Sequence, residues 1–388
     1  MSGIYLVAAE PSGDAFAAEI VDALRARSGE IVIHGVGGSE LASRGIESPI
    51  DISPLSIVGL LDGLKVYREV IALADAAVDD IIAHEPEQVL LVDSWGFMIR
   101  VAERLRARRP DIRIVKVIGP QVWATRPGRA VKLARTVDAV LCIHDFERPF
   151  YEGLDVETAI IGNPAFGRDI SGDAEAYRAS RGLDAGTPLV TVLPGSRSSE
   201  MRRVAPALIE AAALLSDARP DLALAIAPSP GMAGELDLGR LERAGNVDLI
   251  TVEGRRHDAI AASDLVLACS GTVTTEVAML GAPVIVAYKL GWVTWAIARS
   301  FLYKPEHITL MNIATRNEIA PEFVQTRCRP ELIAEAASAL LASPERRLRQ
   351  VAGQNAALQM MGIGGEPAAA RVADHVLGAR PTPPPQPG

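Results

Sequence analysis

Short apolar runs alternate with longer amphipathic segments along most of this 388-residue chain. In the first half, the apolar runs have the length and the polar borders of buried strands. They lie at residues 4–9, 31–36, 88–93, 112–118, 139–143 and 158–161. Segments between them, such as 15–27 and 96–107, repeat apolar residues at helical spacing. This alternation predicts βαβ units and a mostly parallel sheet that helices cover on both faces.

The same pattern begins again after Gly162-Asn163-Pro164 and a polar stretch. Its apolar runs lie at 189–193, 223–227, 249–252, 265–268 and 284–287, and helical patterns follow at 331–342, 345–358 and 368–377. We therefore predict an α/β fold of two Rossmann-like, doubly wound domains that face a central cleft. The predicted divisions are 1–165, 166–343, a helical segment at 344–378 and a disordered Pro-rich tail at 379–388.

Composition narrows the classes of function. The net charge of −9 and the pI near 5.3 argue against a nucleic-acid binder, because neutralising phosphates requires a cationic surface. The three cysteines are far apart and form no Cys-x-x-Cys pair, which fits a reducing compartment. The first residues lead directly into an apolar run without a basic region, and no apolar run reaches the roughly 18 residues of a membrane span. We expect a cytoplasmic protein.

The clearest candidate chemistry follows the predicted strand at 265–268. There Ser270-Gly271-Thr272 lead into a helical segment that carries Glu276. In parallel sheets, ligands bind beyond the carboxyl ends of the strands, where a helix N-terminus offers N–H groups to a phosphate. Glu276 lies one turn after Thr272 and would then face ribose hydroxyls. An ordinary helix cap by Ser270 or Thr272, with an exposed glutamate, explains the same residues.

A second loop of this kind follows the predicted strand at 189–193. It consists of Pro194-Gly195-Ser196-Arg197, with Glu200 one turn later. Gly195 permits a tight turn, and the planar guanidinium of Arg197 can bind a diphosphate through two hydrogen bonds. Two anion-binding loops in one domain predict a site for a nucleotide diphosphate. Because the sequence has no Asp-x-Asp motif, no His–Glu pair at the spacing of metal ligands and no Cys–His cluster, we expect neither a metal nor another cofactor.

The first domain offers a carboxylate and two glycine-containing loops. Asp93 ends the predicted strand at 88–93, where it would act as a general base or cap the following helix. Ala9-Glu10-Pro11-Ser12-Gly13-Asp14 joins the first strand to its helix. Gly35-Val36-Gly37-Gly38 begins like a dinucleotide fingerprint, but Glu40 stands where the third glycine belongs. The indication of an NAD site is therefore weak.

In their order along the chain, these motifs resemble the lipid-A-disaccharide synthase family. The matching stretches are Ala9–Asp14, Gly35–Gly38 with Gly45, Ser56-Ile57-Val58-Gly59, Val92-Asp93, Pro120-Gln121-Val122-Trp123-Ala124 with Arg126, Gly162-Asn163-Pro164, Leu193–Arg197 with Glu200, Ser270-Gly271-Thr272 with Glu276, Met311-Asn312-Ile313 and Pro321-Glu322. Each stretch is short, but their shared order over nearly the whole chain is specific.

The resemblance implies a GT-B fold and an inverting glycosyl transfer. UDP-2,3-diacylglucosamine would donate its acylated sugar to 2,3-diacylglucosamine 1-phosphate, giving a β-linked disaccharide 1-phosphate and UDP. Asp93 would be the base. The nucleotide would be bound by Ser196, Arg197, Ser270, Gly271, Thr272 and Glu276, and the acceptor or cleft residues would be Ser12, Gly13, Asp14, Trp123, Arg126 and Asn312. The family also leads us to expect that the helices at 344–378 return to the first domain; a homodimer stays open.

The sequence departs from the family beside the proposed acceptor site. Ser94-Trp95-Gly96-Phe97-Met98 follows Asp93 where the family usually has Ala-Pro-Asp-Phe-Asn. Gly119 and Gln121 replace serines, Thr125 replaces a tryptophan, and Asn163 replaces a histidine. These changes keep two alternatives open: another GT-B UDP-sugar transferase or UDP-N-acetylglucosamine epimerase, and an inactive GT-B-like protein that binds lipid or nucleotide.

One aromatic-rich segment bears on lipid chemistry independently of the motifs. Residues 290–304 are apolar and weakly basic, and they contain Trp292, Trp295 and Phe301. Such amphipathic segments suit a membrane interface or acyl chains, and a helix in the core is the alternative. We therefore expect peripheral contact with the inner face of the membrane.

Overall fold

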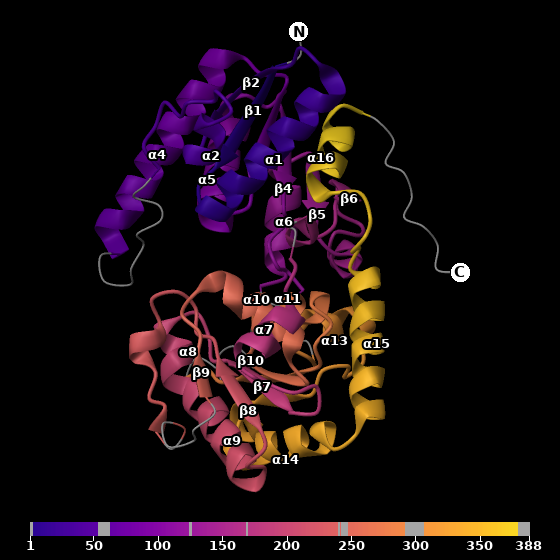
Figure 1. Ribbon diagram of the computed structural model, residues 1–388. Helices are drawn as coiled ribbons and strands as arrows, with labels where there is room; N and C mark the ends of the chain where they lie inside the picture. Colours follow the sequence, from indigo (N-terminus) through magenta and orange to yellow (C-terminus); the bar gives the residue numbers. More distant parts are fainter. Residues whose placement is uncertain are drawn as a thin grey trace. The chain divides into compact units, whose positions relative to one another are not determined.

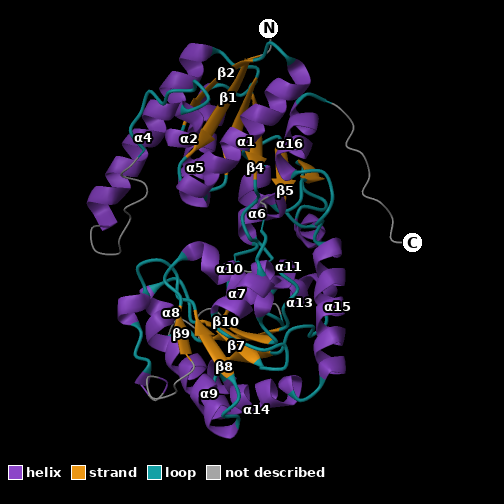
Figure 2. Cartoon of the chain, in the orientation of Figure 1, coloured by secondary structure: helices purple, strands orange, loops and turns teal. Residues whose placement is uncertain are grey.

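The computed structural model describes residues 3–52, 63–123, 126–167, 170–239, 241, 247–291 and 306–378. These residues form two compact units. The first unit contains the described residues up to 167 and those from 362 onward, and the second contains those from 170 to 361. Within this described part, each unit is built around its own six-stranded sheet, drawn as arrows in Figure 2.

In the first unit, all neighbouring strands are parallel, in the order β2-β1-β3-β4-β5-β6. The strands are β1 (Gly3–Ala8), β2 (Val32–Val36), β3 (Gln88–Val92), β4 (Arg113–Val117), β5 (Ala139–Cys142) and β6 (Glu157–Ile160). The chain moves from β1 outward to β2 and then returns to β3 on the other side of β1. This reversal brings the loops after β1 and β3 together at the carboxyl edge of the sheet, where ligands bind in open α/β sheets.

Helices cover both faces of the first sheet because its central strands are apolar on both sides. They are α1 (Pro11–Ser28), α2 (Ser39–Ala42), α4 (Gly63–His84), α5 (Trp95–Arg108), α6 (Gly128–Ala134) and α16 (Ala368–Val376), with short 3₁₀ helices η1 (Asp145–Phe150) and η2 (Pro164–Gly167). One core lies under α1 and α16, and the other lies under α4 and α5. Figure 1 shows α16 beside α1, and the two are joined by Arg27, which pairs with Asp374 at 2.5 Å and Glu366 at 2.7 Å.

The second unit has a parallel sheet in the order β12-β11-β10-β7-β8-β9. The strands are β7 (Leu189–Leu193), β8 (Ala223–Ile226), β9 (Val247–Leu249), β10 (Leu265–Cys269), β11 (Val284–Tyr288) and β12 (Glu322–Val324). Numbered from β7, this is the Rossmann order 3-2-1-4-5-6, whose switch point lies between β7 and β10. The loops after these two strands are therefore neighbours.

The helices of the second unit complete its layers on either side of the sheet. They are α7 (Ala174–Ser180), α8 (Ser198–Arg203), α9 (Ala205–Ala218), α10 (Glu253–Ala262), α11 (Val273–Met279), α13 (Leu310–Thr315), α14 (Pro330–Leu341) and α15 (Pro344–Met360), with η3 (Ala233–Glu235) and η6 (Gln325–Arg327). Helices α9 and α14 bury their apolar faces against β7, β8 and β10 in one core.

The division of the C-terminal segment differs from the one the sequence suggested. We expected the helices at 344–378 to return together to the first domain, but α15 belongs to the second unit and only α16 packs in the first. Strand β9 begins two residues before the expected run at 249–252, and the three-residue strand β12 was not predicted. The expected Pro-rich tail at 379–388 lies outside the described residues.

Candidate functional site

The loop after β7 is shaped around a buried carboxylate. Glu200, 7% exposed, accepts hydrogen bonds from the backbone N–H of Ser196 at 2.9 Å and from Arg197 Nη1 at 3.1 Å. Gly195 has a φ of +132°, and a Cβ there would lie 2.7 Å from Glu200 Cβ. Only glycine fits this turn. The side chain of Arg197 is 75% exposed, so Glu200 anchors the base of the loop while most of the guanidinium faces solvent.

The loop after β10 leads into α11 without a side-chain cap. Thr272 is the residue before the helix, but its side chain makes no capping hydrogen bond, so the alternative of an ordinary cap by Thr272 is wrong. Thr274 Oγ1 instead donates to the Gly271 carbonyl at 2.8 Å. Gly271 and Thr272 are exposed and Ser270 is half-buried. The hydroxyl and N–H groups of this loop thus stand at the start of a helix, the arrangement that binds anions.

Glu276 has a basic partner that the sequence analysis missed. Its Oε2 accepts a hydrogen bond from Arg256 Nη2 at 3.3 Å, and His257 Nε2 lies 3.7 Å from the same oxygen. Arg256 and His257 come from α10, and their Nε and Nε2 atoms are buried without a hydrogen-bond partner. The ion pair fixes Glu276 one turn into α11. Nothing in the spacing of Arg256 and Glu276 along the chain signals this contact.

The two loops meet at the switch point of the second sheet. Strands β7 and β10 pair directly, with Leu193 opposite Ala268. A Cβ at Gly195 would lie 3.7 Å from the Sγ of Cys269, the last residue of β10, so the loop after β7 reaches the end of β10. An exposed guanidinium on one loop and a helix N-terminus on the other can hold a diphosphate between them.

Asp93 lies at the corresponding switch point of the first sheet. It is half-buried directly after β3, and its φ of 53° places it in the left-handed region. The residue that precedes α5 is Ser94, with φ 34° and no side-chain cap, so the alternative of Asp93 as a helix cap is wrong. The first turn of α1 approaches Asp93 closely, since a Cβ at Gly13 would lie 3.5 Å from the Asp93 Cβ. The carboxylate is therefore not used in capping.

Ser12 and Asp14 both lie in the first turn of α1, but their side chains differ in exposure. Ser12 is exposed, whereas Asp14 is 4% exposed. The Asp14 carboxylate accepts from the backbone N–H groups of Gly38 at 2.8 Å, Glu40 at 2.8 Å and Leu41 at 3.3 Å. Asp14 thus joins α1 to the start of α2 through its carboxylate.

The same contacts explain the glycines that resemble a dinucleotide fingerprint. A Cβ at Gly37 would lie 2.8 Å from Asp14 Oδ1, and a Cβ at Gly38 would lie 2.7 Å from Asp14 Oδ2. These glycines make room for a buried carboxylate.

A buried lysine beside Asp93 is the second residue that the sequence analysis missed. Lys116 lies on β4, next to β3, and is 2% exposed. Its Nζ donates to the backbone carbonyl of Asp93 at 2.6 Å. A charged residue inside the apolar run at 112–118 was a visible signal, because lysine is rarely buried without a partner.

Trp123 and Arg126 lie in the loop between β4 and α6. Trp123 is half-buried, with its ring edge-on to Phe146 at a centroid distance of 5.3 Å, and Arg126 is exposed. Arg129 lies with its guanidinium 4.9 Å from the centre of the Trp95 ring. Burial lowers the pKa of Arg129, and so does the positive charge of Arg126. The two arginines therefore make a local cationic site close to the segment that follows Asp93.

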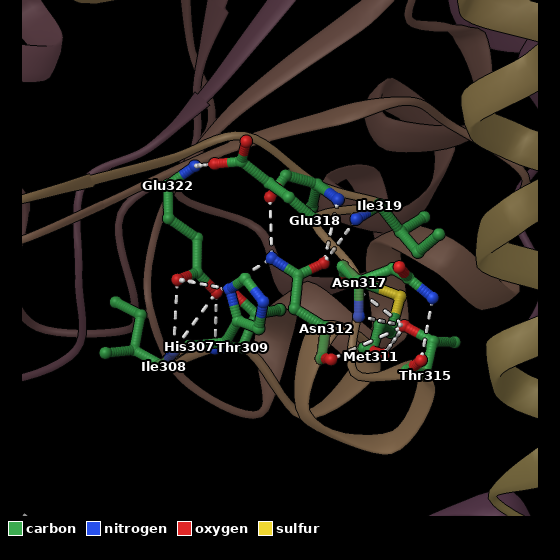
Figure 3. A network of polar contacts seen from close by, with 11 residues as sticks. His307, Ile308, Thr309, Met311, Asn312, Thr315, Asn317, Glu318, Ile319 and Glu322 are labelled. Carbon is green, nitrogen blue, oxygen red and sulfur yellow. Dashed lines mark hydrogen bonds and ion pairs between the residues drawn. The ribbon is translucent and has the colours of Figure 1, made fainter. Parts of the chain in front are cut away.

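Asn312, which the resemblance assigns to the acceptor or the cleft, is held by hydrogen bonds within its own unit. It lies fully buried in α13, where its side-chain nitrogen donates to the Ala320 carbonyl at 2.7 Å and to Glu322 Oε1 at 2.9 Å. Its side-chain oxygen accepts from the N–H groups of Ile319 at 2.8 Å and Ala320 at 2.9 Å. Figure 3 shows this network closing the loop between α13 and β12. With these four contacts, Asn312 organises the loop between α13 and β12.

The carboxylate of Glu322 extends the same network. It accepts from the backbone N–H groups of Ile308 and Thr309, and His307 Nδ1 lies 3.7 Å from Oε2. This buried glutamate therefore connects β12 to the chain entering α13.

Three predicted contacts with lipid, Trp292, Trp295 and Phe301, lie outside the described residues. In the part that is described, no helix is long and apolar enough to cross a membrane. Nor does that part bring three or more histidine, cysteine, aspartate or glutamate side chains into a group that could hold a metal ion.

Comparison with known proteins identifies the family. Residues 4–375 match the family model described as lipid-A-disaccharide synthetase. The chain belongs to this family. It is 34% identical over 378 residues to the lipid-A-disaccharide synthase of Paramagnetospirillum magneticum (strain AMB-1), covering 96% of each chain. It is 35% identical over 375 residues to the enzyme of that name from Anaeromyxobacter dehalogenans (strain 2CP-1), covering 97% of each. The resemblance inferred from the motifs is confirmed.

Solved structures support the predicted GT-B fold. A UDP-GlcNAc 2-epimerase from Neisseria meningitidis, bound to UDP-GlcNAc, aligns with a TM-score of 0.63 and 14% identity over 97% of this chain and all of that chain. MurG from Acinetobacter baumannii aligns with a TM-score of 0.58 and 14% identity, with the same coverage. At this identity the likeness concerns the fold alone. The family relationship makes the chain a glycosyltransferase of lipid A biosynthesis, and the epimerase and inactive-protein alternatives are not favoured.

Proposed function

We propose that this member of the family transfers 2,3-diacylglucosamine from UDP-2,3-diacylglucosamine to 2,3-diacylglucosamine 1-phosphate. The observation that carries the proposal is the pair of adjacent loops at the β7–β10 switch point, one with the exposed Arg197 and one with the start of α11. Their chemistry suits the diphosphate of a nucleotide sugar. Family membership then supplies the acylated sugar and the acceptor.

The donor would be bound through its nucleotide. The guanidinium of Arg197, with Ser196 beside it, would bind the diphosphate together with Ser270, Gly271 and Thr272. Glu276, fixed by Arg256, would accept hydrogen bonds from ribose hydroxyls. In this arrangement the diphosphate needs no metal ion, since fixed N–H donors would stabilise its charge.

The reaction needs a base for the acceptor hydroxyl. Asp93 would remove the proton as the acceptor oxygen attacks C1 of the donor sugar and the bond from C1 to the diphosphate breaks. Arg197 and the α11 N-terminus would stabilise the negative charge that develops on the departing UDP. Attack opposite the leaving group inverts the configuration at C1 and gives a β-linked product.

The acceptor also carries a phosphate, and Arg126 and Arg129 are candidates to bind it. The positive charges of Arg126 and Arg129 repel each other, and a dianion bound by both would relieve this repulsion. Trp123 and the exposed Ser12 would complete this side of the site. For the acyl chains, we propose that the segment at 290–304 contacts the inner face of the membrane.

A comparison of two variants in the transfer assay tests these roles. We expect Asp93→Asn to lower kcat by about 10²- to 10⁴-fold, because a general base is lost, and to leave UDP affinity unchanged. Arg197→Ala should instead weaken UDP binding by about 1.5 to 3 kcal/mol, the range of a charge-assisted hydrogen bond. UDP affinity is measured by calorimetry and kcat by product formation at saturating substrates.

Matched controls come from the same two units. Asp111→Asn and Arg202→Ala change exposed residues that have no role in the proposed site and should leave both quantities unchanged. Near wild-type turnover in Asp93→Asn, with UDP bound normally, would show that Asp93 is not the base.

A further inference from the structure

Lys116 occupies a position on β4 that the strand pattern assigns to an apolar side chain. Alternate residues of β4 face opposite sides of the sheet, and Ile114, on the same side as Lys116, packs in the core under α4 and α5. Lys116 is nevertheless 2% exposed. A buried ammonium is costly unless hydrogen bonds replace its water, so an apolar residue would fill this position at lower cost.

All four hydrogen-bond partners of Lys116 Nζ are backbone carbonyl oxygens. The distances are 3.2 Å to Leu91, 2.6 Å to Asp93, 2.9 Å to Val117 and 2.9 Å to Ile118. These carbonyls belong to the carboxyl ends of β3 and β4 and to the residues that follow them. One side chain therefore connects the exits of two neighbouring strands.

The backbone at these exits is strained. Asp93, Ser94 and Ile118 have φ values of 53°, 34° and 62°. Non-glycine residues avoid this left-handed region, and a β-branched residue such as Ile118 avoids it most strongly. Such conformations persist only where surrounding contacts impose them. Lys116 binds the carbonyls of Asp93 and Ile118, so it fixes two of the peptide groups that bear the strain.

We propose that Lys116 is a positioning residue for the transfer reaction, which holds the backbone of Asp93 in the conformation that presents its carboxylate to the acceptor. This inference rests on the proposed role of Asp93 as the base. Lys116 acts through the main chain of Asp93 and does not touch the substrates. A displacement of the base by about 1 Å is enough to lower a rate by about 10²-fold.

The electrostatic environment of Lys116 agrees with this geometry. Burial lowers the pKa of Lys116 to about 7, and the carboxylates of Asp93 and Glu10 oppose that change by favouring the ammonium. Both carboxylates follow strands that end at the same edge of the sheet, β3 and β1. The protonated form offers three N–H donors to the four carbonyls and is therefore the form that holds the loop best.

A double-mutant cycle tests the proposal. The transfer rate at saturating substrates is measured for the wild type, Lys116→Met, Asp93→Asn and the double variant, and UDP affinity is measured for each. We expect Lys116→Met to lower kcat by about 10- to 100-fold with UDP affinity within about twofold of wild type. In the Asp93→Asn background, the same substitution should change kcat by less than about twofold, because the group that Lys116 positions is already gone.

Lys132→Met removes a half-exposed lysine that pairs with Glu103 in the same unit, and it should keep wild-type kcat. If Lys116→Met does not fold by circular dichroism, Lys116→Gln, which keeps N–H donors without charge, goes through the same cycle. Wild-type kcat in the Lys116 variant, or losses that multiply in the double variant, would overturn the positioning role. Wild-type kcat in Asp93→Asn alone would overturn the base itself, a distinct failure.

Discussion

Hydrogen-bond partners decide what each polar side chain near a strand end can do. Asp14, Asp93 and Asn312 all stand in motifs that resemble the family, and their residue types alone suit ligand contact. Asp14 and Asn312 are buried, with their polar atoms bound to backbone groups, whereas Asp93 is half-buried and makes no helix cap. Of these three residues, Asp93 is therefore the one that we propose as the base for the acceptor hydroxyl.

Asn312→Ala tests how far the hydrogen bonds of Asn312 stabilise this loop. The substitution removes two donated and two accepted hydrogen bonds and leaves Glu322 without one of its donors inside the protein. We expect the free energy of unfolding of the second unit to fall by about 2 to 4 kcal/mol, measured by urea denaturation. Asn317→Ala, at an exposed position of the same loop, should cost less than about 0.5 kcal/mol.

A loss of ligand binding without a loss of stability would contradict this structural role of Asn312. If the Asn312→Ala protein unfolds at the wild-type urea concentration but loses UDP or acceptor binding, the side chain contacts a ligand after all.

Sequence could place these residues at strand ends but could not supply their partners. The N–H groups that bind Asp14 lie 24 to 27 residues later, and the carbonyl of Asp93 lies 23 residues before Lys116. Such contacts depend on strand order and register, which local spacing does not encode. For the same reason Arg256, on a different helix from Glu276, was not predicted as its partner.

At the scale of the element, the positions of the strands were predicted more closely than the exact ends of the strands or the caps of the helices. The buried parallel strands are apolar on both faces, so their runs stand out in the sequence, and eleven of them were expected within two residues of the observed start. Strand β12 has only three residues and begins with the buried Glu322, so it carries no such signal. The residue types at Ser270 and Thr272 allowed a helix cap, but the side chain of Thr272 makes no capping hydrogen bond to α11.

The aromatic-rich segment at 290–304 carries a prediction of its own. Replacing Trp292 and Trp295 by serine should weaken binding to vesicles that contain anionic phospholipid at least about tenfold. Burial of one large apolar side chain is worth about 1.5 to 3 kcal/mol, and both tryptophans would lose it. Binding is measured by co-sedimentation, with circular dichroism to confirm the fold.

Leu348→Ser is the matched control for this experiment, because Leu348 is 70% exposed on α15 and lies outside the segment. Unchanged co-sedimentation of the double tryptophan variant would contradict the proposed membrane contact and favour a core helix.

At the scale of the whole molecule, two doubly wound sheets each provide one switch point with a distinct chemistry. The second offers an exposed guanidinium and a helix N-terminus, which suit a nucleotide diphosphate. The first offers a carboxylate whose backbone a buried lysine holds, which suits a base. The family match over residues 4–375 connects these two chemistries to lipid A biosynthesis. The changes at Ser94–Met98 lie beside Asp93, where we propose that the acceptor binds, so an assay with the proposed acceptor is the sharpest test of the proposal.

The most direct measurement is a mass-spectrometric transfer assay with UDP-2,3-diacylglucosamine and 2,3-diacylglucosamine 1-phosphate, run in the presence of EDTA. We predict formation of the β-linked disaccharide 1-phosphate and UDP, with no turnover when unacylated UDP-N-acetylglucosamine replaces the donor. Absence of the disaccharide while UDP still binds, or turnover of the unacylated donor alone, would contradict the proposed substrates. Loss of product only when EDTA is present would contradict the metal-independent stabilisation of the leaving group.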